Sequence, residues 1–328
     1  DTEEELDFKV TVLALWIKEA KHFVAFTGAG ISTAAGISDY RSGVNTVLNV
    51  GPGVWEKKKH NIKTKEKKAD LKLKMQSAFP TITHMALTEF SNKNYLKFLI
   101  SQNVDGLHIK SGIPADKISE LHGNTNLEYC TKCNKKIFRD YKCRNNTDVH
   151  KHTTGRKCFD CKSELKDSII NFNENLNDFE LDIAFDNARN SDLMWCLGSS
   201  LRVSPASDLP VETMKNKGKI VIVNLQKTPY SDIAALSIYG KIEDVMERLI
   251  NKLEIPLPKW NFSRKIEIKF NAGEKELLFV PKHVTGNYFS FIKKIDIIYF
   301  NETTSIKKEP FSYKFKDYVN NTNKIKLN

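Results

Sequence analysis

Residues 22–32 read HFVAFTGAGIS, and the expected class of fold follows from this stretch. Its first five residues suit a short buried strand, and TGAGIS then supplies two closely spaced glycines. A strand that passes through a glycine turn into a helix is the opening of a nucleotide-binding βα unit. In such a unit Gly28 and Gly30 let the backbone approach a phosphate, and the following helix N-terminus favours its negative charge.

Strand and helix patterns alternate along the chain up to residue 253. Such alternation favours a Rossmann-like α/β fold, with a parallel sheet covered by helices on both faces. Two later turns, GSS (198–200) and VNLQ (223–226), each follow a strand pattern and place small or amide side chains there. Helices are expected at 6–21, 81–93, 179–192 and 241–253, and strands at 22–26, 95–104, 193–201 and 218–226.

Changes in composition divide the chain into three predicted domains. Residues 1–124 and 171–255 would form the nucleotide-binding domain, with an insertion at about 42–78 that includes the lysine-rich stretch 56–74. Residues 125–170 are rich in cysteine and lysine and predict a small metal-binding domain. Residues 256–328 contain alternating apolar and polar runs, which predict a C-terminal β-rich extension.

The chain has 328 residues and a formal net charge of +11. This charge suits an acidic or nucleic-acid partner without proving one. The lysine-rich stretch is either a solvated face or a segment with a nucleic-acid or localisation role. No apolar run approaches the ~18–20 residues of a membrane span, so we expect no membrane partner. The chain does not begin with methionine, so it can be a piece of a longer protein.

Two Cys-x-x-Cys pairs predict a structural zinc site. Cys130 pairs with Cys133, and Cys158 pairs with Cys161. Two such pairs can supply the four thiolates of a tetrahedral zinc site, which is coordinatively closed and therefore structural rather than catalytic. Three further residues near the pairs are possible alternative ligands, namely Cys143, His150 and His152.

A histidine lies just before the first cysteine pair, in SELHGN (119–124). The residues alone leave three interpretations of His122 open: a zinc ligand, a catalytic base or a buried core histidine. His84 and His108 offer the same chemistry, and we interpret them as structural. Cys196 lies in a strand pattern and is expected in the core.

Taken together, these motifs resemble the sirtuin family of NAD-dependent protein deacylases. The matching segments follow the family order across about 6–255, and finer features such as GPGVW (51–55) and PTITHMAL (80–87) resemble its class IV branch. The other matching segments are TGAGISTAAGISDYR (27–41), SQNVDGLH (101–108), LHGN (121–124), the two cysteine pairs, LGSSL (197–201) and IVNLQ (222–226).

The resemblance implies that NAD and an acylated lysine meet between a Rossmann-like domain and an inserted zinc domain. It implies that His122 is the catalytic base and that Asn103 and Asp105 act beside it. The NAD-binding residues that it implies are Gly28, Ala29, Gly30, Thr33, Asp39, Tyr40, Arg41, Trp55, Gln102, Gly198, Ser199, Ser200, Asn224, Leu225, Gln226 and Ile242. Asp39 has an alternative as a helix cap or turn residue.

Some positions depart from known patterns. Thr33 replaces the third glycine of the dinucleotide fingerprint, and no acidic residue follows at a strand end about 20 positions on, so an ordinary dehydrogenase fits poorly. Against the family, Ser38 replaces a proline, and residues 42–50 are inserted before GPGVW. NFNE (171–174) stands where the family has a different stretch beside the acyl-lysine channel.

The resemblance implies an NAD-dependent deacylase that acts on histone or other chromatin-associated acyl-lysine in the nucleus. The products would be nicotinamide, O-acyl-ADP-ribose and the free lysine. Nucleic-acid or nucleosome contact through the basic surface is also expected. Two alternatives remain, namely mono-ADP-ribosyl transfer from NAD to protein and a weakly catalytic chromatin-binding module.

Overall fold

The structure is a computed structural model that describes residues 1–43, 48, 51–62, 77–146, 148–299, 302–315 and 326–327. Most of the predicted insertion at about 42–78, with most of the lysine-rich stretch 56–74, lies outside the described residues. The chain forms two compact units. The first comprises Asp1–Asn124 and Ile169–Trp260, and the second comprises Thr125–Ser168 and Asn261–Asn328.

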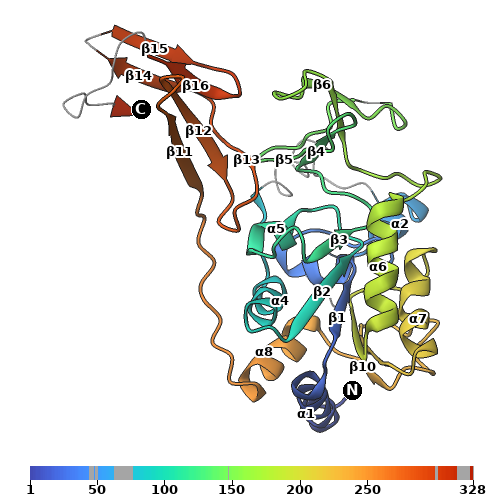
Figure 1. The fold of residues 1–328 in the computed structure, drawn as a ribbon. Helices are drawn as coiled ribbons and strands as arrows, with labels where there is room; N and C mark the ends of the chain where they lie inside the picture. Colours follow the sequence, from blue (N-terminus) through green and yellow to red (C-terminus); the bar gives the residue numbers. More distant parts are fainter. Residues whose placement is uncertain are drawn as a thin grey trace. The chain divides into compact units, whose positions relative to one another are not determined.

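A parallel sheet of six strands forms the centre of the first unit (Figure 1). Its spatial order is β10-β9-β8-β1-β2-β3, and every neighbouring pair is parallel. Numbered by their place in the chain, these strands read 6-5-4-1-2-3, which is the order of the doubly wound dinucleotide-binding fold. The strands are β1 (Phe23–Thr27), β2 (Leu96–Ser101), β3 (Ile118–Glu120), β8 (Leu193–Leu197), β9 (Lys219–Val223) and β10 (Leu236–Ile238).

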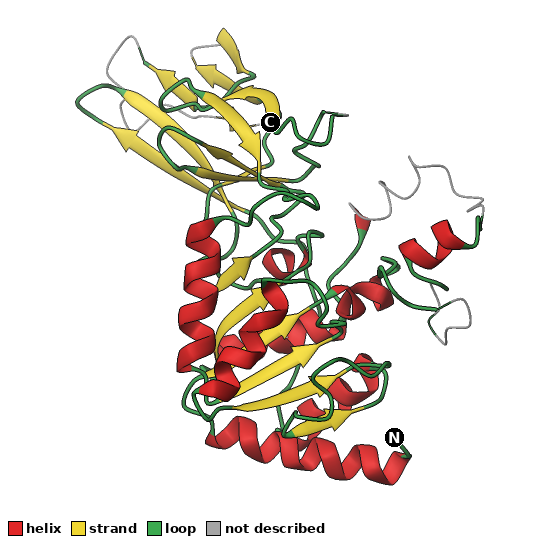
Figure 2. Cartoon of the chain, turned by 90° about the vertical axis from the view of Figure 1, so that its right-hand side faces the viewer, coloured by secondary structure: helices red, strands yellow, loops and turns green. Residues whose placement is uncertain are grey.

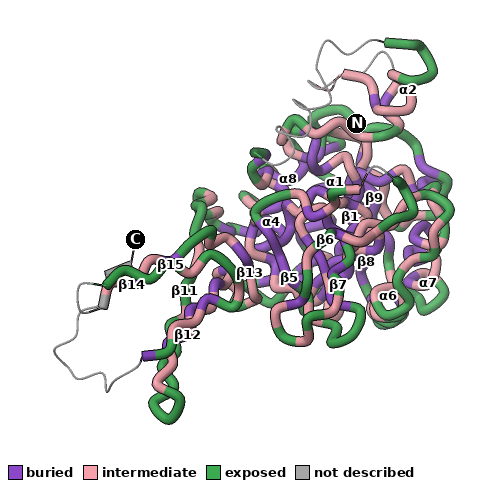
Figure 3. Tube along the Cα trace, turned by 90° about the horizontal axis from the view of Figure 1, so that it is seen from above, coloured by how far each residue is buried: buried purple, intermediate pink, exposed green. Residues whose placement is uncertain are grey.

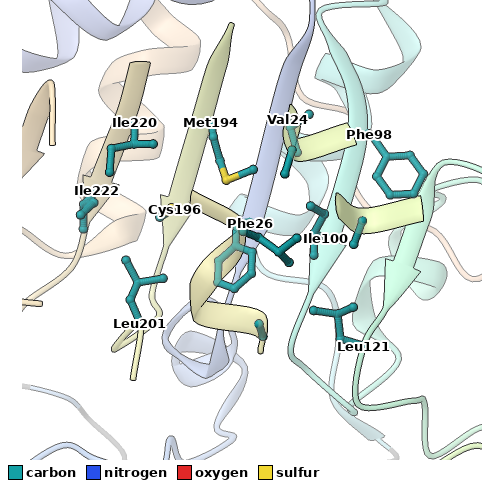
Figure 4. Close-up of a cluster of buried hydrophobic side chains, with 14 residues drawn as sticks. Val24, Phe26, Phe98, Ile100, Leu121, Met194, Cys196, Leu201, Ile220 and Ile222 are labelled. Atoms are coloured by element: carbon teal, nitrogen blue, oxygen red, sulfur yellow. The ribbon is translucent and has the colours of Figure 1, made fainter. Parts of the chain in front are cut away.

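Helices cover both faces of this sheet (Figure 2). On one face, α6 (Asp178–Asn190) and α7 (Leu209–Lys215) pack over a buried cluster that includes Val24, Phe26 and Met194 (Figure 4). The other face is covered by α1 (Glu3–Glu19), α4 (Ile82–Asn92) and α8 (Ile242–Lys252). The predicted parallel sheet with helices on both faces is therefore confirmed.

The central strands are buried on both faces because successive side chains point in opposite directions. Val24 and Phe26 face the α6 side, whereas Phe23 lies 6.2 Å from the ring of Trp195 in β8. Trp195 in turn lies 6.5 Å from Phe90 of α4. All residues of β1 and β8 are buried, as are those of β9 after its exposed first residue, Lys219. Figure 3 colours the chain by burial and labels these strands.

The structure shifts the first helix relative to its prediction, from 6–21 to Glu3–Glu19. Thr2 caps the helix in a capping box with Glu5, and three acidic residues fill the first turn, where they favour a helix N-terminus. The glycine turn after β1 leads into a 3₁₀ helix, η1 (Ala29–Ala35), rather than an α-helix. Short elements complete the unit, namely α2 (Val54–Lys59), α5 (Leu107–Ser111) and η2 (Ala206–Asp208).

The second unit contains three smaller sheets. In the first, the order β13-β5-β4-β7-β6 brings the cysteine segment together with β13 of the C-terminal segment. The strands of this sheet are β4 (Leu127–Cys130), β5 (Lys136–Arg139), β6 (Thr153–Lys157), β7 (Glu164–Asp167) and β13 (Phe289–Ser290).

The C-terminal segment contains the β-structure that the sequence predicted. Its two sheets have the orders β11-β12-β16 and β15-β14-β17. Their strands are β11 (Lys265–Asn271), β12 (Glu276–Lys282), β14 (Ile295–Tyr299), β15 (Glu302–Ile306), β16 (Phe311–Lys314) and β17 (Lys326–Leu327). The structure groups this segment with the cysteine segment in one compact unit, and the division into three domains stays a prediction. Among the described residues, no helix combines the length and apolar character that crossing a membrane requires.

Candidate active site and cysteine cluster

The loops after β1 and β8 lie side by side because these strands are parallel neighbours. The strand order reverses between β1 and β8, and doubly wound sheets bind their ligands at the carboxyl ends of the strands at such a point. The two glycine turns found in the sequence are these two loops. The structure therefore brings TGAGIS (27–32) and GSS (198–200) to one edge of the sheet.

Three glycines let the two loops touch. Gly28 N–H donates to the Leu197 carbonyl at 2.9 Å, and Gly30 N–H donates to the Gly198 carbonyl at 2.9 Å. A Cβ on Gly28 would lie 2.7 Å from the Gly198 carbonyl oxygen, and one on Gly30 would lie 2.7 Å from the Gly198 Cα. Gly198 also has a positive φ of +60°, which favours glycine. These glycines are thus needed for backbone contact between the loops, in addition to any ligand contact.

A buried network connects the loop after β1 to the loop after β2. Ser32 Oγ donates to Asp105 Oδ2 at 2.7 Å, and Asn103 Nδ2 donates to the Gly28 carbonyl at 3.1 Å. Asp105 Oδ1 accepts from Leu107 N–H at 2.8 Å. Asn103 and Asp105 are only 7% and 8% exposed. Both side chains are therefore held in fixed positions next to the glycine turn.

His122 lies beside this network through Gln102. Its Nδ1 is 2.9 Å from the Gln102 carbonyl oxygen, while the Gln102 side chain accepts from Ser199 Oγ at 2.7 Å. Because a carbonyl oxygen only accepts, Nδ1 must carry the proton, and Nε2 is then the basic nitrogen of the neutral ring. Burial lowers the pKa of His122, and the hydrogen bond to the Gln102 carbonyl partly opposes this effect. The ring therefore stays neutral to lower pH than an exposed histidine.

Aromatic and basic side chains gather after η1. The guanidinium of Arg41 lies 4.2 Å from the ring centre of Trp55, and the ring of Tyr40 lies 5.9 Å away from it. Phe172 also lies beside Trp55, with ring centres 5.9 Å apart. The Asp39 carboxylate accepts from Ser42 Oγ at 2.5 Å, a bond that is typical of a turn residue and is compatible with a cofactor contact as well.

The remaining predicted cofactor residues lie in η1 or in the loops after β8 and β9, except Ile242, which begins α8. Thr33 Oγ1 donates to the Gly30 carbonyl at 2.9 Å, and Ile242 lies 6% exposed against Gly198. The Asn224 side chain donates to the Gln226 carbonyl at 2.9 Å. Ala29 begins η1, Ser200 lies in the loop after β8, and Leu225 is 38% exposed in the loop after β9.

Sequence reasoning gave no role to Ser32 or to Phe172. Ser32 stands inside TGAGIS, but its partner Asp105 lies 73 positions away in the chain, and no local pattern connects the two. Phe172 belongs to NFNE (171–174), for which the sequence indicated only a difference from the family pattern. Its contact with Trp55 depends on the fold that brings these distant positions together.

The four cysteines of the two pairs form one cluster in the second unit. Their sulfur atoms all lie within 4.8 Å of one another, with Cys130 Sγ 3.3 Å from Cys161 Sγ and Cys133 Sγ 3.6 Å from Cys158 Sγ. A zinc ion with Zn–S bonds of ~2.3 Å separates its sulfur ligands by ~3.8 Å. The cluster therefore fits a tetrahedral zinc ion with four thiolate ligands.

Both cysteine pairs lie at the turns of β-hairpins, β4–β5 and β6–β7. In each turn a residue with positive φ donates its N–H back to the first cysteine: Asn134 to the Cys130 carbonyl at 2.9 Å and Lys162 to the Cys158 carbonyl at 3.0 Å. The alternative ligands predicted from the sequence do not belong to this cluster of four cysteines. Cys143 is buried outside the cluster, and His152 Nδ1 lies 3.3 Å from an Asp167 oxygen.

A buried carboxylate organises the same unit. Glu128 of β4 is fully buried and accepts from Arg139 of β5 at 2.6 Å and from Arg156 of β6 at 2.8 Å. Arg139 also donates to Ser290 Oγ at 2.5 Å and lies 3.1 Å from a Glu309 oxygen. These bonds connect the cysteine segment to the C-terminal segment, although 151 to 170 positions separate the partners in the chain.

A model of the Sir2 family matches residues 28–205, which is more than half of the chain. The chain belongs to the Sir2 family. Among curated relatives it is similar to NAD-dependent protein deacetylase SRT1 of Oryza sativa subsp. indica, with 34% identity over 98% of this chain and 66% of that protein. It is also similar to NAD-dependent protein deacetylase sirtuin-7 of Mus musculus, with 40% identity over 80% of this chain and 63% of that protein.

A solved Sir2 structure with a p53 peptide and NAD⁺ has a TM-score of 0.55 and 31% identity, covering 75% of this chain and 98% of that one. The recognised family and the observed Rossmann-like sheet therefore agree. The chain spans about two thirds of the length of the curated relatives named above.

Proposed function

We propose that this chain is an NAD-dependent protein-lysine deacylase. The observation that carries the proposal is the fixed tautomer of His122, whose Nδ1 donates to the Gln102 carbonyl and leaves Nε2 as a base. The family to which the chain belongs and the deacetylase names of its relatives support the same activity.

The groups at the carboxyl edge of the sheet fit NAD in chemistry. Small and amide side chains after β8 and β9 can hydrogen-bond a ribose and an adenine, while Trp55 and Tyr40 offer aromatic faces. We assign cofactor contacts to the residues that the sequence predicted, namely Gly28, Ala29, Gly30, Thr33, Asp39, Tyr40, Arg41, Trp55, Gln102, Gly198, Ser199, Ser200, Asn224, Leu225, Gln226 and Ile242.

NAD, when bound, supplies an anomeric carbon with nicotinamide as its leaving group, which the amide oxygen of an acyl-lysine can attack. His122 Nε2 then accepts the proton of a ribose hydroxyl. Asn103 and Asp105 orient the ribose or a water molecule, because Ser32 and the backbone hold both side chains in place. Most of the rate enhancement in this scheme comes from positioning weak reactants.

We further propose that the four-cysteine cluster holds a structural zinc ion in the cysteine segment 125–170. The substrate class is the acylated lysine of proteins, with histone tails as the favoured targets and the nucleus as the location. The net charge of +11 and the similarity to sirtuin-7 support this part of the proposal, as they support nucleosome contact.

Nicotinamide release from NAD with a panel of acyl-lysine peptides tests the activity, with and without nucleic acid. His122→Ala should lower turnover by about 10²-fold or more, because it removes the general base. Its melting temperature and zinc content should match those of the unchanged protein. His60→Ala is the matched control, since His60 is exposed at the C-cap of α2 and is not among the predicted site residues. Full turnover in His122→Ala would contradict the assignment.

The same assay separates the alternatives from deacylation. Transfer of ADP-ribose to a protein, detected as a mass increase without loss of acyl groups, would favour a mono-ADP-ribosyltransferase. Salt-sensitive nucleic-acid binding without turnover would favour a chromatin-binding module.

The pH dependence of kcat/KM gives a second test of His122. Burial lowers its pKa below the usual 6.5, so the base stays neutral until the pH falls through this lowered value. The acid limb of the profile should therefore have its midpoint below pH 6.5. A midpoint above 6.5 would show that another group limits the reaction.

A further inference from the structure

The C-terminal sheet β11-β12-β16 has one apolar face that is only partly covered. Register pairs place Ile268, Phe279 and Phe311 in one row across the three strands. Phe279 and Phe311 are each 2% exposed, whereas Ile268 in β11 is 52% exposed. The apolar face that forms the core under β12 and β16 thus continues uncovered onto β11.

Three residues of β11 share this exposed face, because side chains alternate along a strand. Ile266 is 47%, Ile268 is 52% and Phe270 is 51% exposed. The opposite face of β11 carries Lys265, Glu267, Lys269 and Asn271. β11 is also an edge strand (Figure 1): among the described strands, only β12 pairs with it. Its other edge therefore offers backbone donors and acceptors beside an apolar stripe, a combination that favours strand addition.

The sequence of β11, KIEIKFN, is self-complementary about its central residue. In an antiparallel pair of two copies centred on Ile268, Ile266 would face Phe270 of the second copy and Ile268 would face itself. On the other face, Glu267 would lie opposite Lys269 in both directions. Opposite charges in directly facing positions stabilise an antiparallel pair, and like charges destabilise it.

The other two-fold registers that keep the apolar faces on the same side of the paired sheet are less favourable, because they pair like charges or leave residues unpaired. Centring on Glu267 places two glutamates opposite each other, and centring on Lys269 places two lysines opposite each other. Centring on Ile266 or Phe270 leaves part of the seven-residue strand without a partner. A shift by one residue would put the apolar stripes on opposite faces. Only the register centred on Ile268 uses the whole strand and pairs the charges.

We propose that β11 is a dimerisation strand, through which two copies of this chain join their C-terminal sheets by antiparallel pairing centred on Ile268. The lysines of β11, which normally protect an edge strand, are compatible with this pairing because Glu267 meets Lys269 of the second copy. A two-fold contact of this kind uses the same surface on both copies, so the assembly ends at a dimer.

The mass of the full chain in solution tests the proposal, by light scattering over a concentration series up to about 100 µM, where weak dimers are populated. The expected mass rises to that of two chains, and Ile268→Lys keeps the mass of one chain at all concentrations. A single-chain mass for the unchanged protein at all concentrations would overturn the proposal. The same result is expected if the edge of β11 instead pairs with an extended segment of another protein.

Charge exchange tests the register. Glu267→Lys and Lys269→Glu should each weaken dimerisation at least tenfold, because each places like charges opposite one another. The double variant Glu267→Lys/Lys269→Glu should restore dimerisation, since the opposite charges meet again. A double variant that remains monomeric, while its zinc content and melting temperature equal those of the unchanged protein, would overturn the register.

Cysteine cross-linking gives an independent measurement of the same register. Directly facing residues have Cα atoms ~4.5–5.5 Å apart, within the range of a disulfide, so Ile268→Cys should form a covalent dimer under mild oxidation. Phe270→Cys is the matched control, because the two copies of residue 270 would lie four residues apart along the pair, about 13 Å. Equal cross-linking of both variants, or none of Ile268→Cys above the unchanged protein, would contradict the proposal.

Discussion

The first unit surrounds a parallel sheet with helices and buries a large apolar cluster. Among the described residues, the second unit has two smaller apolar clusters, a cluster of four cysteines and a set of buried charges. In the first unit the candidate site is built from hydrogen bonds and close backbone contacts at the ends of strands. In the second unit Cys130 and Cys158 belong both to the metal cluster and to a core cluster with Ile137 and Leu165. We infer that metal and ion pairs stabilise the second unit where apolar burial is limited.

The largest expected effect concerns the metal. Cys130→Ser removes one of the four thiolates, and structural zinc sites contribute roughly 10 kcal/mol or more to folding. We expect loss of bound zinc and rapid proteolysis within 125–168, while the helical circular dichroism of the first unit persists. Zinc content and limited proteolysis measure these effects. Cys143→Ser is the matched control, because Cys143 is buried outside the cluster; a stable, metal-free Cys130→Ser protein would refute the structural role.

The next effect concerns the buried charge. Glu128→Gln leaves Arg139 and Arg156 without their shared carboxylate, and breaking a buried ion pair costs about 3–5 kcal/mol. Thermal unfolding of the full chain should show the second unit melting earlier, with the first unit unchanged. Glu164→Gln on the exposed face of β7 is the control and should change little. Equal melting of both variants would show that the ion pairs do not stabilise this unit.

A smaller effect is expected at the glycine loops of the first unit. Gly198→Ala places a Cβ 2.8 Å from Gly30 Cα and from an Ile242 methyl group, at a φ of +60°. Overpacking and the left-handed backbone together should cost about 2–4 kcal/mol. Because the displaced loops line the candidate cofactor site, affinity for NAD should fall as well. Calorimetric titration with NAD measures this, with Gly43→Ala as a control at a position with open space.

The smallest effect is a pH dependence that belongs to the first unit. Burial lowers the pKa of His84 to about 3, and burial also lowers that of His108, whose ring lies 4.8 Å away. The unfolded chain therefore binds more protons than the folded one below pH 6.5. Stability is fully present above pH 6.5 and is lost by about 1.4 kcal/mol per pH unit below it for His84.

His84→Gln should reduce this slope in denaturant unfolding followed between pH 7 and pH 5.5. An unchanged slope in His84→Gln would show that His84 is not the group that carries the acid sensitivity.

Local patterns predicted most elements of the first unit, because a buried parallel strand and an amphipathic helix each leave a periodic signal. The helix expected at 81–93 is Ile82–Asn92, and the strand expected at 218–226 is Lys219–Val223. The short elements β3, β10 and α7 had no such signal and were missed. The glycine turn was expected to open a helix, and the structure has the 3₁₀ helix η1 there, which ends at Gly36 with a positive φ of +82°.

The sequence by itself determined the family, the two cysteine pairs and the alternation that makes a parallel sheet. The cysteine pairs and the alternation depend on residues that are close together in the chain. The family can be identified from the order of its motifs along the chain. It also separated His122 from the cysteines, and among the described residues the metal cluster contains only the four cysteines.

Only the tertiary structure decided which distant residues meet. It brings Ser32 to Asp105, Ser199 to Gln102, and Arg139 to Glu309, across 73, 97 and 170 positions. It also shows that Gly28, Gly30 and Gly198 lie where the two loops touch, so that a side chain on any of them would collide with the facing loop. Such contacts leave no periodic trace in the sequence, because they are formed by the packing of whole strands and loops rather than by the local preferences of the residues involved.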